Sequence, residues 1–193
     1  LFRAGSVSKL FIWTALMQLA EQGRLDLDAD VHAYLGDFRL PEPVDGIDSE
    51  PITLAHLMAH TPGFEDRGIG LFTKDPAQVV SLEAAVTTNV PKRIRPAGVA
   101  ASYSNYGALL AAYIVQRVSG VEFNEYVRRN IFAPLGMNES TFSQPPPEAL
   151  AQRLSKGYYY AVTGEDAPPP EAQSFEYEQG TSMGGLTTST PDL

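Results

Sequence analysis

The chain has 193 residues, of which 44% are hydrophobic and 19% charged, enough apolar side chains for a folded core in one domain. Its formal net charge of −9 argues against the basic surface that nucleic-acid binding requires, so we expect no nucleic-acid partner. The absence of cysteine excludes disulfides, thiol catalysis and cysteine-bound metals.

The first predicted element is a helix over residues 7–22. Apolar side chains cover nearly its whole circumference, which predicts a helix buried on all sides. Gly23 is suited to end it as a C′ glycine. Its uncharged core, from Leu10 to Ala20, is too short to span a bilayer. The aspartates of residues 24–35 are suited to capping a short second helix.

Helical spacing continues through the middle of the chain. We expect four further helices, over 52–60 with Thr53 as N-cap, 77–90, 104–120, and 122–136 with breaks at Pro134 and Gly136. After residue 136 the sequence becomes rich in proline and glycine, and 155–162 is the one clear strand candidate. The tyrosine run 158–160 is expected to pack within that strand. Strands are therefore scarce.

The segment "AGSVSKLF" places a serine and a lysine where a helix begins. Ser6 follows Gly5 at the predicted N-terminus, where the helix dipole favours negative charge on oxygen. Lys9 lies three residues later on the same face, and burial of its stem disfavours the charged amine. A neutral amine beside a serine is a workable general base. On this motif alone, a helix cap followed by a lysine reaching the surface remains the simpler interpretation.

A second candidate pair opens the helix predicted over 104–120. The hydroxyl of Tyr103 near a cationic lysine can act as an acid or base, and the Asn105 amide can hold a lysine and bind a substrate amide. The alternative is a buried tyrosine with a bonded hydroxyl and a helix-capping asparagine. Both motifs together, each opening a helix, are much rarer by chance than either alone.

At this point five segments carry a family resemblance. "FRAGSVSKLF", "LMAHTPGFED", "YSNYGALLAAYIVQRVSG", "FAPLGM" and "GGLTTSTPDL" resemble, in the family's order, the serine β-lactamase and penicillin-binding protein-like family. The resemblance is to its class C side, which includes class C β-lactamases, DD-carboxypeptidases, D-aminopeptidases and related esterases. It implies an α+β chain with the β-lactamase/transpeptidase-like fold, mainly its helical region with few strands.

The same resemblance implies roles for individual residues. Ser6 would be the acylated nucleophile and Lys9 its base, with Tyr103 as acid/base and Asn105 as a substrate-binding residue. The backbone N–H of Ser6 would be one oxyanion donor, and no cofactor is implied. Gly184 and Gly185 would border the pocket and permit close backbone approach, although ordinary turn glycines are the alternative.

The histidines are weaker candidates. In "HTPG" we interpret His60 as structural, with Pro62 and Gly63 shaping a turn, against the rarer alternative of a catalytic or metal-binding histidine. His32 and His56 show no metal-ligand spacing, so we expect no metal.

The resemblance also predicts what the chain lacks. Strands that precede the nucleophile helix in the family, its third motif and the strands that follow would lie outside 1–193, making this the central, helix-rich part of a hydrolase domain. We therefore expect apolar side chains of the first helix to be exposed to solvent unless a second chain covers them. We also expect catalysis to be impaired, because one oxyanion donor is lost. Composition leaves the compartment open, and the resemblance favours the periplasm or secretion.

Two function classes follow. The first is a serine hydrolase acting on an amide or ester, such as a β-lactam, a D-amino-acid peptide or a small ester, through an acyl-serine intermediate. The second is a non-catalytic module of the same fold that binds peptide or peptidoglycan. A purely structural helical bundle would explain the helices but would leave the paired motifs to coincidence.

Overall fold

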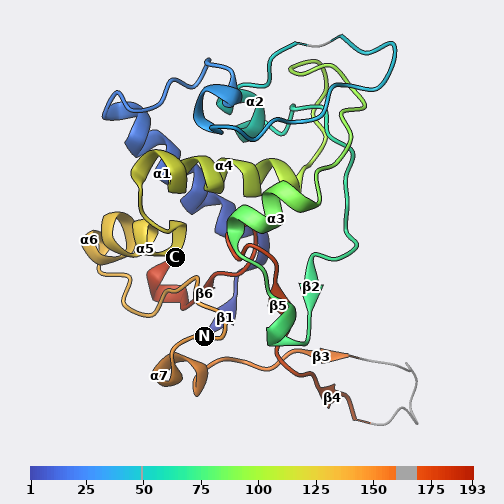
Figure 1. The fold of residues 1–193 in the computed structure, drawn as a ribbon. Coiled ribbons are helices and arrows are strands. Elements are labelled where there is room, and N and C mark those ends of the chain that lie inside the picture. The colour runs from blue at the N-terminus through green and yellow to red at the C-terminus, as the bar shows by residue number, and fades with distance from the viewer. Residues whose placement is uncertain (49, 160–168) are drawn as a thin grey trace.

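In the computed structural model, which describes residues 1–48, 50–159 and 169–193, helices form one body and short two-stranded ribbons lie at one end of it (Figure 1). This is the expected α+β arrangement, dominated by helices. The N-terminal strand and the C-terminal segment lie close together beside the ribbons.

Two helices form the centre of the helical body. The helix α1 (Lys9–Glu21) follows a 3₁₀ turn at Gly5–Ser8 and packs against α4 (Asn105–Ser119). The inner face of α1 is sealed by residues of zero exposure, namely Ile12, Ala15, Leu16 and Leu19. On α4 every residue from Tyr106 to Val115 is buried. The helices α2 (Leu54–Met58) and α3 (Leu82–Thr88) pack against α4 as well.

The prediction that the first helix is buried on all sides is wrong. Val7, Leu10 and Met17 are 51%, 56% and 40% exposed on one face of the turn and helix, whereas Lys9 is only 4% exposed. The cause is that the neighbours of α1, namely α4, α5 and the turn after α5, contact it on other faces. Within the described residues this apolar face is not fully covered.

Most predicted helix caps are confirmed. Gly23 follows α1 with a φ of +68°, and its N–H donates to the Ala20 carbonyl at 2.9 Å. Thr53 caps α2 by accepting from the backbone N–H of His56. On α4 the cap is Ser104, which accepts from Gly107, so the interpretation of Asn105 as the cap is wrong.

Two predicted helices are shorter than expected. The helix predicted over 77–90 begins only at Leu82, because Ser81 has an extended backbone and its hydroxyl caps Ala84 at 3.1 Å. Residues 24–35 contain a single 3₁₀ turn, Val31–Tyr34, which the Asp30 side chain caps as expected.

The helix predicted over 122–136 runs through its proline. The elements α5 (Phe123–Val127), a π-helical turn (Arg128–Phe132) and α6 (Ala133–Leu135) follow one another without a gap, and the break comes only at Gly136, with a φ of +71°. Pro134 has no N–H for the carbonyl of Asn130. The side chain of Gln18 on α1 donates to that carbonyl instead, at 3.0 Å. A last short helix, α7, spans Glu148–Ala151.

The described strands are two residues long and pair antiparallel. The pairs are β1 (Phe2–Arg3) with β6 (Thr187–Thr188), β2 (Phe72–Thr73) with β5 (Tyr177–Glu178), and β3 (Tyr158–Tyr159) with β4 (Glu171–Ala172). The predicted strand over 155–162 is thus confirmed at 158 and 159, while 160–162 lie outside the described residues. Tyr158 is 54% exposed, so packing does not explain this member of the tyrosine run.

Candidate active site

Lys9 is the buried centre of the site. Its Nζ donates to Ser6 Oγ at 3.2 Å, to Asn105 Oδ1 at 2.9 Å and to the Met183 carbonyl at 2.8 Å. At 4% exposure it does not reach the surface, so the interpretation of Lys9 as a surface charge is wrong. Three distant chain segments therefore meet at one ammonium group, which has an acceptor for each of its protons.

The Ser6 hydroxyl receives a second contact from Tyr103. Tyr103 Oη donates to Ser6 Oγ at 2.7 Å, and Lys9 Nζ lies 4.9 Å from the centre of the tyrosine ring. Tyr103 is 46% exposed, so the alternative of a buried tyrosine is wrong. The hydroxyl, amine and phenol identified in the sequence thus converge on one oxygen at the surface end of α1.

His60 holds Tyr103 in place. The two rings lie 4.5 Å apart between centroids, the Ser104 N–H donates to His60 Nδ1 at 3.2 Å, and the Ser102 N–H donates to the His60 carbonyl at 2.7 Å. Burial, and then the charge of Lys9, lower the pKa of His60. A neutral imidazole can accept the Ser104 N–H, which agrees with the structural role expected for this residue.

The turn after His60 needs its glycine. Gly63 has a φ of +83°, and a Cβ there would lie 2.1 Å from the Arg95 carbonyl oxygen. Larger side chains are therefore excluded at this position by both conformation and space. The turn fixes the approach of the loop that carries Tyr103, since Arg95 lies a few residues before it.

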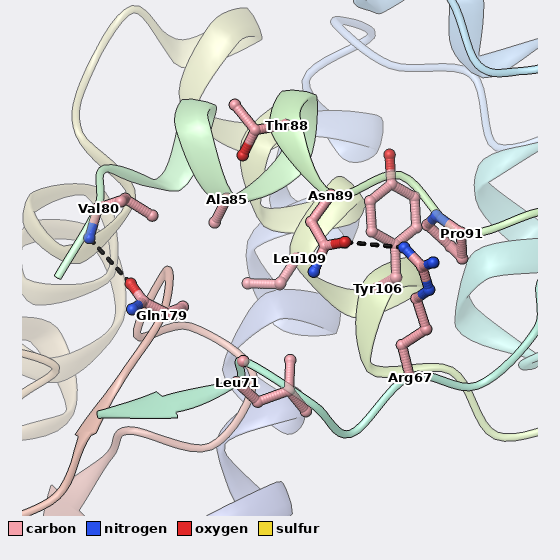
Figure 2. Close-up of a pocket in the computed structure, with 11 residues that line it drawn as sticks. Arg67, Leu71, Val80, Ala85, Thr88, Asn89, Pro91, Tyr106, Leu109 and Gln179 are labelled. Carbon is pink, nitrogen blue, oxygen red and sulfur yellow. Dashed lines mark hydrogen bonds between the residues drawn. The ribbon is translucent and has the colours of Figure 1, made fainter. Parts of the chain in front are cut away.

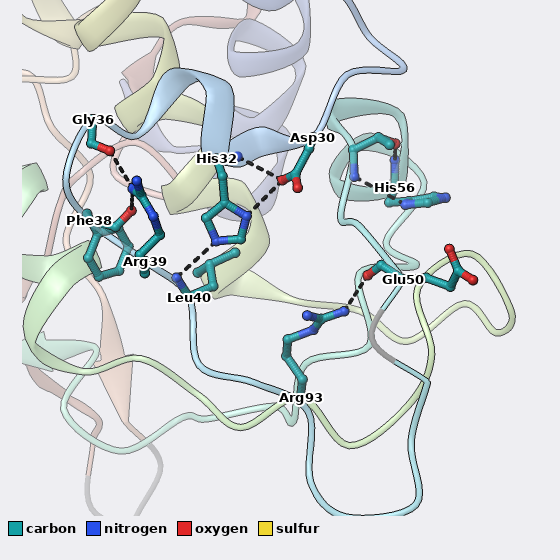
Figure 3. A network of polar contacts seen from close by, with 10 residues as sticks. Asp30, His32, Gly36, Phe38, Arg39, Leu40, Glu50, His56 and Arg93 are labelled. Atoms are coloured by element: carbon teal, nitrogen blue, oxygen red, sulfur yellow. Dashed lines mark hydrogen bonds and ion pairs between the residues drawn. The ribbon is translucent and has the colours of Figure 1, made fainter.

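The other two histidines belong to a separate polar network (Figure 3). His32 Nδ1 lies 2.8 Å from Asp30 Oδ1, and His32 Nε2 accepts the Leu40 N–H at 3.2 Å. His56 Nδ1 accepts the Thr53 N–H at 3.2 Å and completes the cap of α2. In the described part of the chain no three His, Asp or Glu side chains gather as metal ligands would.

A cleft of about 250 Å³ opens beside Ser6. It is lined by Arg3, Gly5, Ser6, Leu71, Phe72, Asn105, Glu178, Met183 and Gly184. Of the two predicted pocket glycines, Gly184 lines the cleft and Gly185 is buried behind it. The close approach at Gly185 is internal, because a Cβ there would lie 2.5 Å from the Thr181 carbonyl.

Glu178 is the residue of this cleft that the sequence did not point to. It is 2% exposed, and burial raises its pKa to about 7, against the opposing effects of the Arg3 and Lys9 charges and of the Gly184 N–H. One acidic residue in an irregular polar segment has no periodicity or motif that marks it. The pairing of β5 with β2 places it in register with Phe72, and both residues line the same cleft as Ser6.

Ser8 connects the two sides of the site. Its hydroxyl accepts the Leu186 N–H at 3.1 Å, a contact across 178 residues of the chain. The Gly5–Ser8 turn and the glycine turn at 180–186 are therefore joined directly, next to the pairing of β1 with β6.

A match to the family described as Beta-lactamase covers residues 1–193. The chain belongs to the Beta-lactamase family. It is 29% identical over 177 residues to monacolin J acid methylbutanoyltransferase of Aspergillus terreus, covering 84% of this chain and 43% of that relative. It is 31% identical over 189 residues to esterase EstB of Burkholderia gladioli, covering 89% and 46%.

A solved Beta-lactamase relative shares the fold. The octameric penicillin-binding protein homologue from Pyrococcus abyssi superposes with a TM-score of 0.73 at 27% identity, covering 98% of this chain and 42% of that one. The chain thus spans less than half the length of each of these three relatives. The family as a whole supports serine hydrolase or acyl-transfer chemistry. No helix among the described residues is long and apolar enough to cross a membrane.

A second, more apolar hollow of about 210 Å³ lies beside the cleft of this Beta-lactamase family chain (Figure 2). Leu71 lines both spaces, and Tyr106 and Leu109 of α4 form one wall of the hollow. Its rim is polar: Arg67 donates to Asn89 Oδ1 at 2.8 Å. The hollow is therefore an apolar recess with a polar rim, and it shares Leu71 with the cleft at Ser6.

Proposed function

We propose that this protein is a serine hydrolase that cleaves an amide or ester through an acyl-Ser6 intermediate. The observation that carries the proposal is the double contact at Ser6 Oγ, 2.7 Å from the Tyr103 hydroxyl and 3.2 Å from the Lys9 amine. A nucleophile with two proton-transfer groups in direct contact is the arrangement that covalent acyl transfer needs.

Lys9 serves as the base in acylation. As Ser6 Oγ bonds to the substrate carbonyl carbon, its proton passes to Lys9 Nζ, and negative charge collects on the carbonyl oxygen, which the Ser6 backbone N–H stabilises. When the bond to the leaving nitrogen or oxygen breaks, Tyr103 protonates the leaving group and regains a proton from Lys9. The acyl group then remains on Ser6 as an ester.

Deacylation reverses these roles. A water molecule, or an alcohol in acyl transfer, attacks the ester carbonyl while Tyr103 accepts its proton and passes its own proton to Lys9 Nζ, and Lys9 then returns a proton to Ser6 Oγ as that oxygen leaves. Asn105 supports both steps. Its Oδ1 holds Lys9, and its Nδ2, which bonds no other described residue, is free to donate to a substrate amide oxygen. Gly184 lines the space the substrate would occupy.

We propose that the apolar recess takes the hydrocarbon part of the acyl group. Its volume of about 210 Å³ exceeds the 150 Å³ or so that holds a benzene ring in a protein cavity. Relatives named as an esterase and a methylbutanoyltransferase are consistent with a small acyl group. Ala85→Leu fills the recess from α3, and we expect it to reduce reaction with hexanoyl esters more than with acetyl esters. Equal loss for both would contradict this assignment.

A further proposal concerns the cellular location of the protein. We propose a periplasmic or secreted location, which fractionation of the native cells would test.

We also propose that a second polypeptide packs over the exposed side chains of Val7, Leu10 and Met17. Sedimentation of the wild-type chain and of Leu10→Glu would test this, since the charge should abolish any association.

The test of the reaction uses the whole chain with p-nitrophenyl esters, nitrocefin and benzylpenicillin. We expect turnover or a covalent adduct with at least one of these, lost in Ser6→Ala and retained in the matched control Ser174→Ala, which alters an exposed serine. Binding of penicillin or a D-alanyl peptide by calorimetry, with neither adduct nor turnover, would instead support the non-catalytic binding module.

A further inference from the structure

The Glu178 carboxyl lies in the nucleophile cleft and has no role in the reaction described above. It is 2% exposed, and its Oε2 is buried without a hydrogen-bond partner among the described residues. An ionisable group in this state destabilises a fold unless the surroundings use its charge. The burial of this carboxyl in the cleft therefore needs a physical explanation.

The backbone of Glu178 is clamped in place. The side-chain oxygen of Gln144 accepts the Glu178 N–H at 2.9 Å, and the Gln144 amide donates to the Glu178 carbonyl at 2.9 Å. On the opposite side, Glu178 is in register with Phe72 of β2. The side chain is thus presented to the cleft by a fixed strand.

The glycine turn closes around the carboxyl. A Cβ at Gly184 would lie 2.8 Å from Glu178 Oε1, and a Cβ at Gly185 would lie 3.2 Å from Oε2. Neither position has room for a side chain, so the backbone itself packs against the carboxyl. The Gly184 N–H therefore lies near the carboxyl, and its effect there is to lower the Glu178 pKa, against the larger effect of burial.

The same peptide group contacts Lys9 at its other end. The N–H of Gly184 and the carbonyl of Met183 belong to one peptide bond, and that carbonyl accepts from Lys9 Nζ at 2.8 Å. The carboxyl therefore lies at the N–H end of a peptide group whose carbonyl end is hydrogen-bonded to the amine, and charge at one end of such a group polarises the other. A charged carboxylate on the N–H side makes the carbonyl a better acceptor for Lys9.

We propose that Glu178 is a positioning residue that acts through the Met183–Gly184 peptide to hold Lys9 against Ser6. This inference rests on the proposed function for its catalytic consequence, but the linkage itself exists without catalysis. It assigns the two pocket glycines a further purpose: they let a backbone peptide, rather than a side chain, connect the carboxyl with the base.

The linkage predicts a pH dependence with a definite sign. Apart from Glu178 itself, the charged groups that act on this carboxyl are Arg3 from β1 and Lys9 from α1. Above about pH 7 the carboxyl is charged and polarises the peptide, and below it the effect is lost. Replacement by glutamine should therefore matter at high pH and have little effect at low pH.

The first measurement is independent of catalysis. The chain has four lysines, so a ¹³Cε spectrum resolves Lys9, which Lys9→Met identifies by its loss. We expect the Lys9 ¹³Cε signal and the Gly184 amide to share an inflection near pH 7 that Glu178→Gln removes and Glu176→Gln, on the same segment, retains. If both signals keep that inflection in Glu178→Gln, the proposal is overturned.

The second measurement is the rate at which a fluorophosphonate acylates Ser6, followed by intact mass. Glu178→Gln should be about tenfold slower than wild type at pH 8.5 and equal to it at pH 5.5. An equal loss at both values would indicate a merely structural role and would contradict the proposal. If the wild type is not acylated at all, the proposed function fails while the spectra still decide the linkage.

A second variant protects the test against misfolding. Should Glu178→Gln not fold, Gly184→Ala separates the carboxyl from the peptide, because the new Cβ would lie 2.8 Å from Oε1. We expect the Lys9 signal of this variant to lose its inflection near pH 7. Persistence of that inflection in a folded Gly184→Ala protein would also overturn the proposal.

Discussion

The two halves of the active site are built in different ways. The helical half, α1 and α4, presents Lys9 and Asn105 from a core in which Ile12, Leu16 and Leu110 have zero exposure. The ribbon half, which carries Met183 and Gly184, holds polar groups instead. Of the five buried side-chain atoms without a hydrogen-bond partner in the described residues, four lie between 178 and 189.

This difference shows that folding stability and active-site chemistry depend on different parts of the molecule. Apolar burial in the helices supplies folding free energy, whereas buried unpaired polar atoms cost about 1–3 kcal/mol each. A fold tolerates buried unpaired polar atoms in one segment only when the rest of the chain supplies enough folding free energy. We infer that the helical half stabilises the chain and that the ribbon half provides the polar surroundings of the nucleophile.

The largest effect is expected where the two halves meet. Lys9→Ala removes the base and leaves Asn105 Oδ1 and the Met183 carbonyl without their donor. We expect acylation of Ser6 to fall by about 10³-fold or more. Rates of adduct formation with the exposed control Lys92→Ala should match wild type, and comparable rates for both variants would remove Lys9 from the mechanism.

A second pair of variants compares the two faces of α1. Leu16→Ala opens a cavity in the helical half and should lower the free energy of unfolding by about 3–5 kcal/mol. Leu10→Ala, at 56% exposure, should lower it by about 0.5 kcal/mol or less. Urea denaturation measures both. A loss of several kcal/mol for Leu10→Ala would show that its face is covered in solution.

The third prediction is a pH dependence of stability. The pKa of Glu178 rises from its ordinary 4.5 to about 7 on folding, so between these values the unfolded chain releases a proton that the folded chain keeps. The stabilising contribution of this group is complete below about pH 4.5 and is lost as pH rises through 7, a change of about 3 kcal/mol.

Urea titrations at pH 5 and pH 8 measure this contribution. The decrease in free energy of unfolding from the lower to the higher pH should be smaller in Glu178→Gln than in wild type, and Glu176→Gln should behave as wild type. An unchanged decrease in Glu178→Gln would mean that the carboxyl titrates alike in the folded and unfolded chain.

The smallest effect concerns the packing of the glycine turn. Gly184→Ala places a Cβ against the Glu178 carboxyl and should destabilise the fold by about 1–2 kcal/mol. Gly68→Ala is the matched control, because nothing lies within 4 Å of its added Cβ. Thermal unfolding compares the two. If both variants melt at the wild-type temperature, the glycine turn is looser than the structure indicates.

The same division explains what could be predicted from the sequence. Helix periodicity and the caps at Thr53 and Gly23 depend on neighbours within a few residues, and they were predicted correctly. The contact of Ser6 with Lys9 follows from three-residue spacing on a turn of helix. The convergence of Tyr103 on that pair was expected from the resemblance together with its chemistry.

The remaining features depend on pairings across almost the whole chain. Ser8 contacts Leu186 and Lys9 contacts Met183, separations of 178 and 174 residues that no local pattern encodes. Glu178 was missed for this reason. The apolar circumference of α1 wrongly predicted burial on all sides for a related reason, because it does not show which faces the described chain covers; the exposed apolar side chains were expected only from the resemblance.

The most direct test of the account is to locate the covalent adduct. Wild-type protein is incubated with a fluorophosphonate, digested, and the modified peptide is sequenced by tandem mass spectrometry. The account predicts one adduct, on Ser6, that disappears in Ser6→Ala and is strongly slowed in Tyr103→Phe. An adduct on another residue, or one that persists undiminished in Ser6→Ala, would contradict the assignment of Ser6 as the nucleophile.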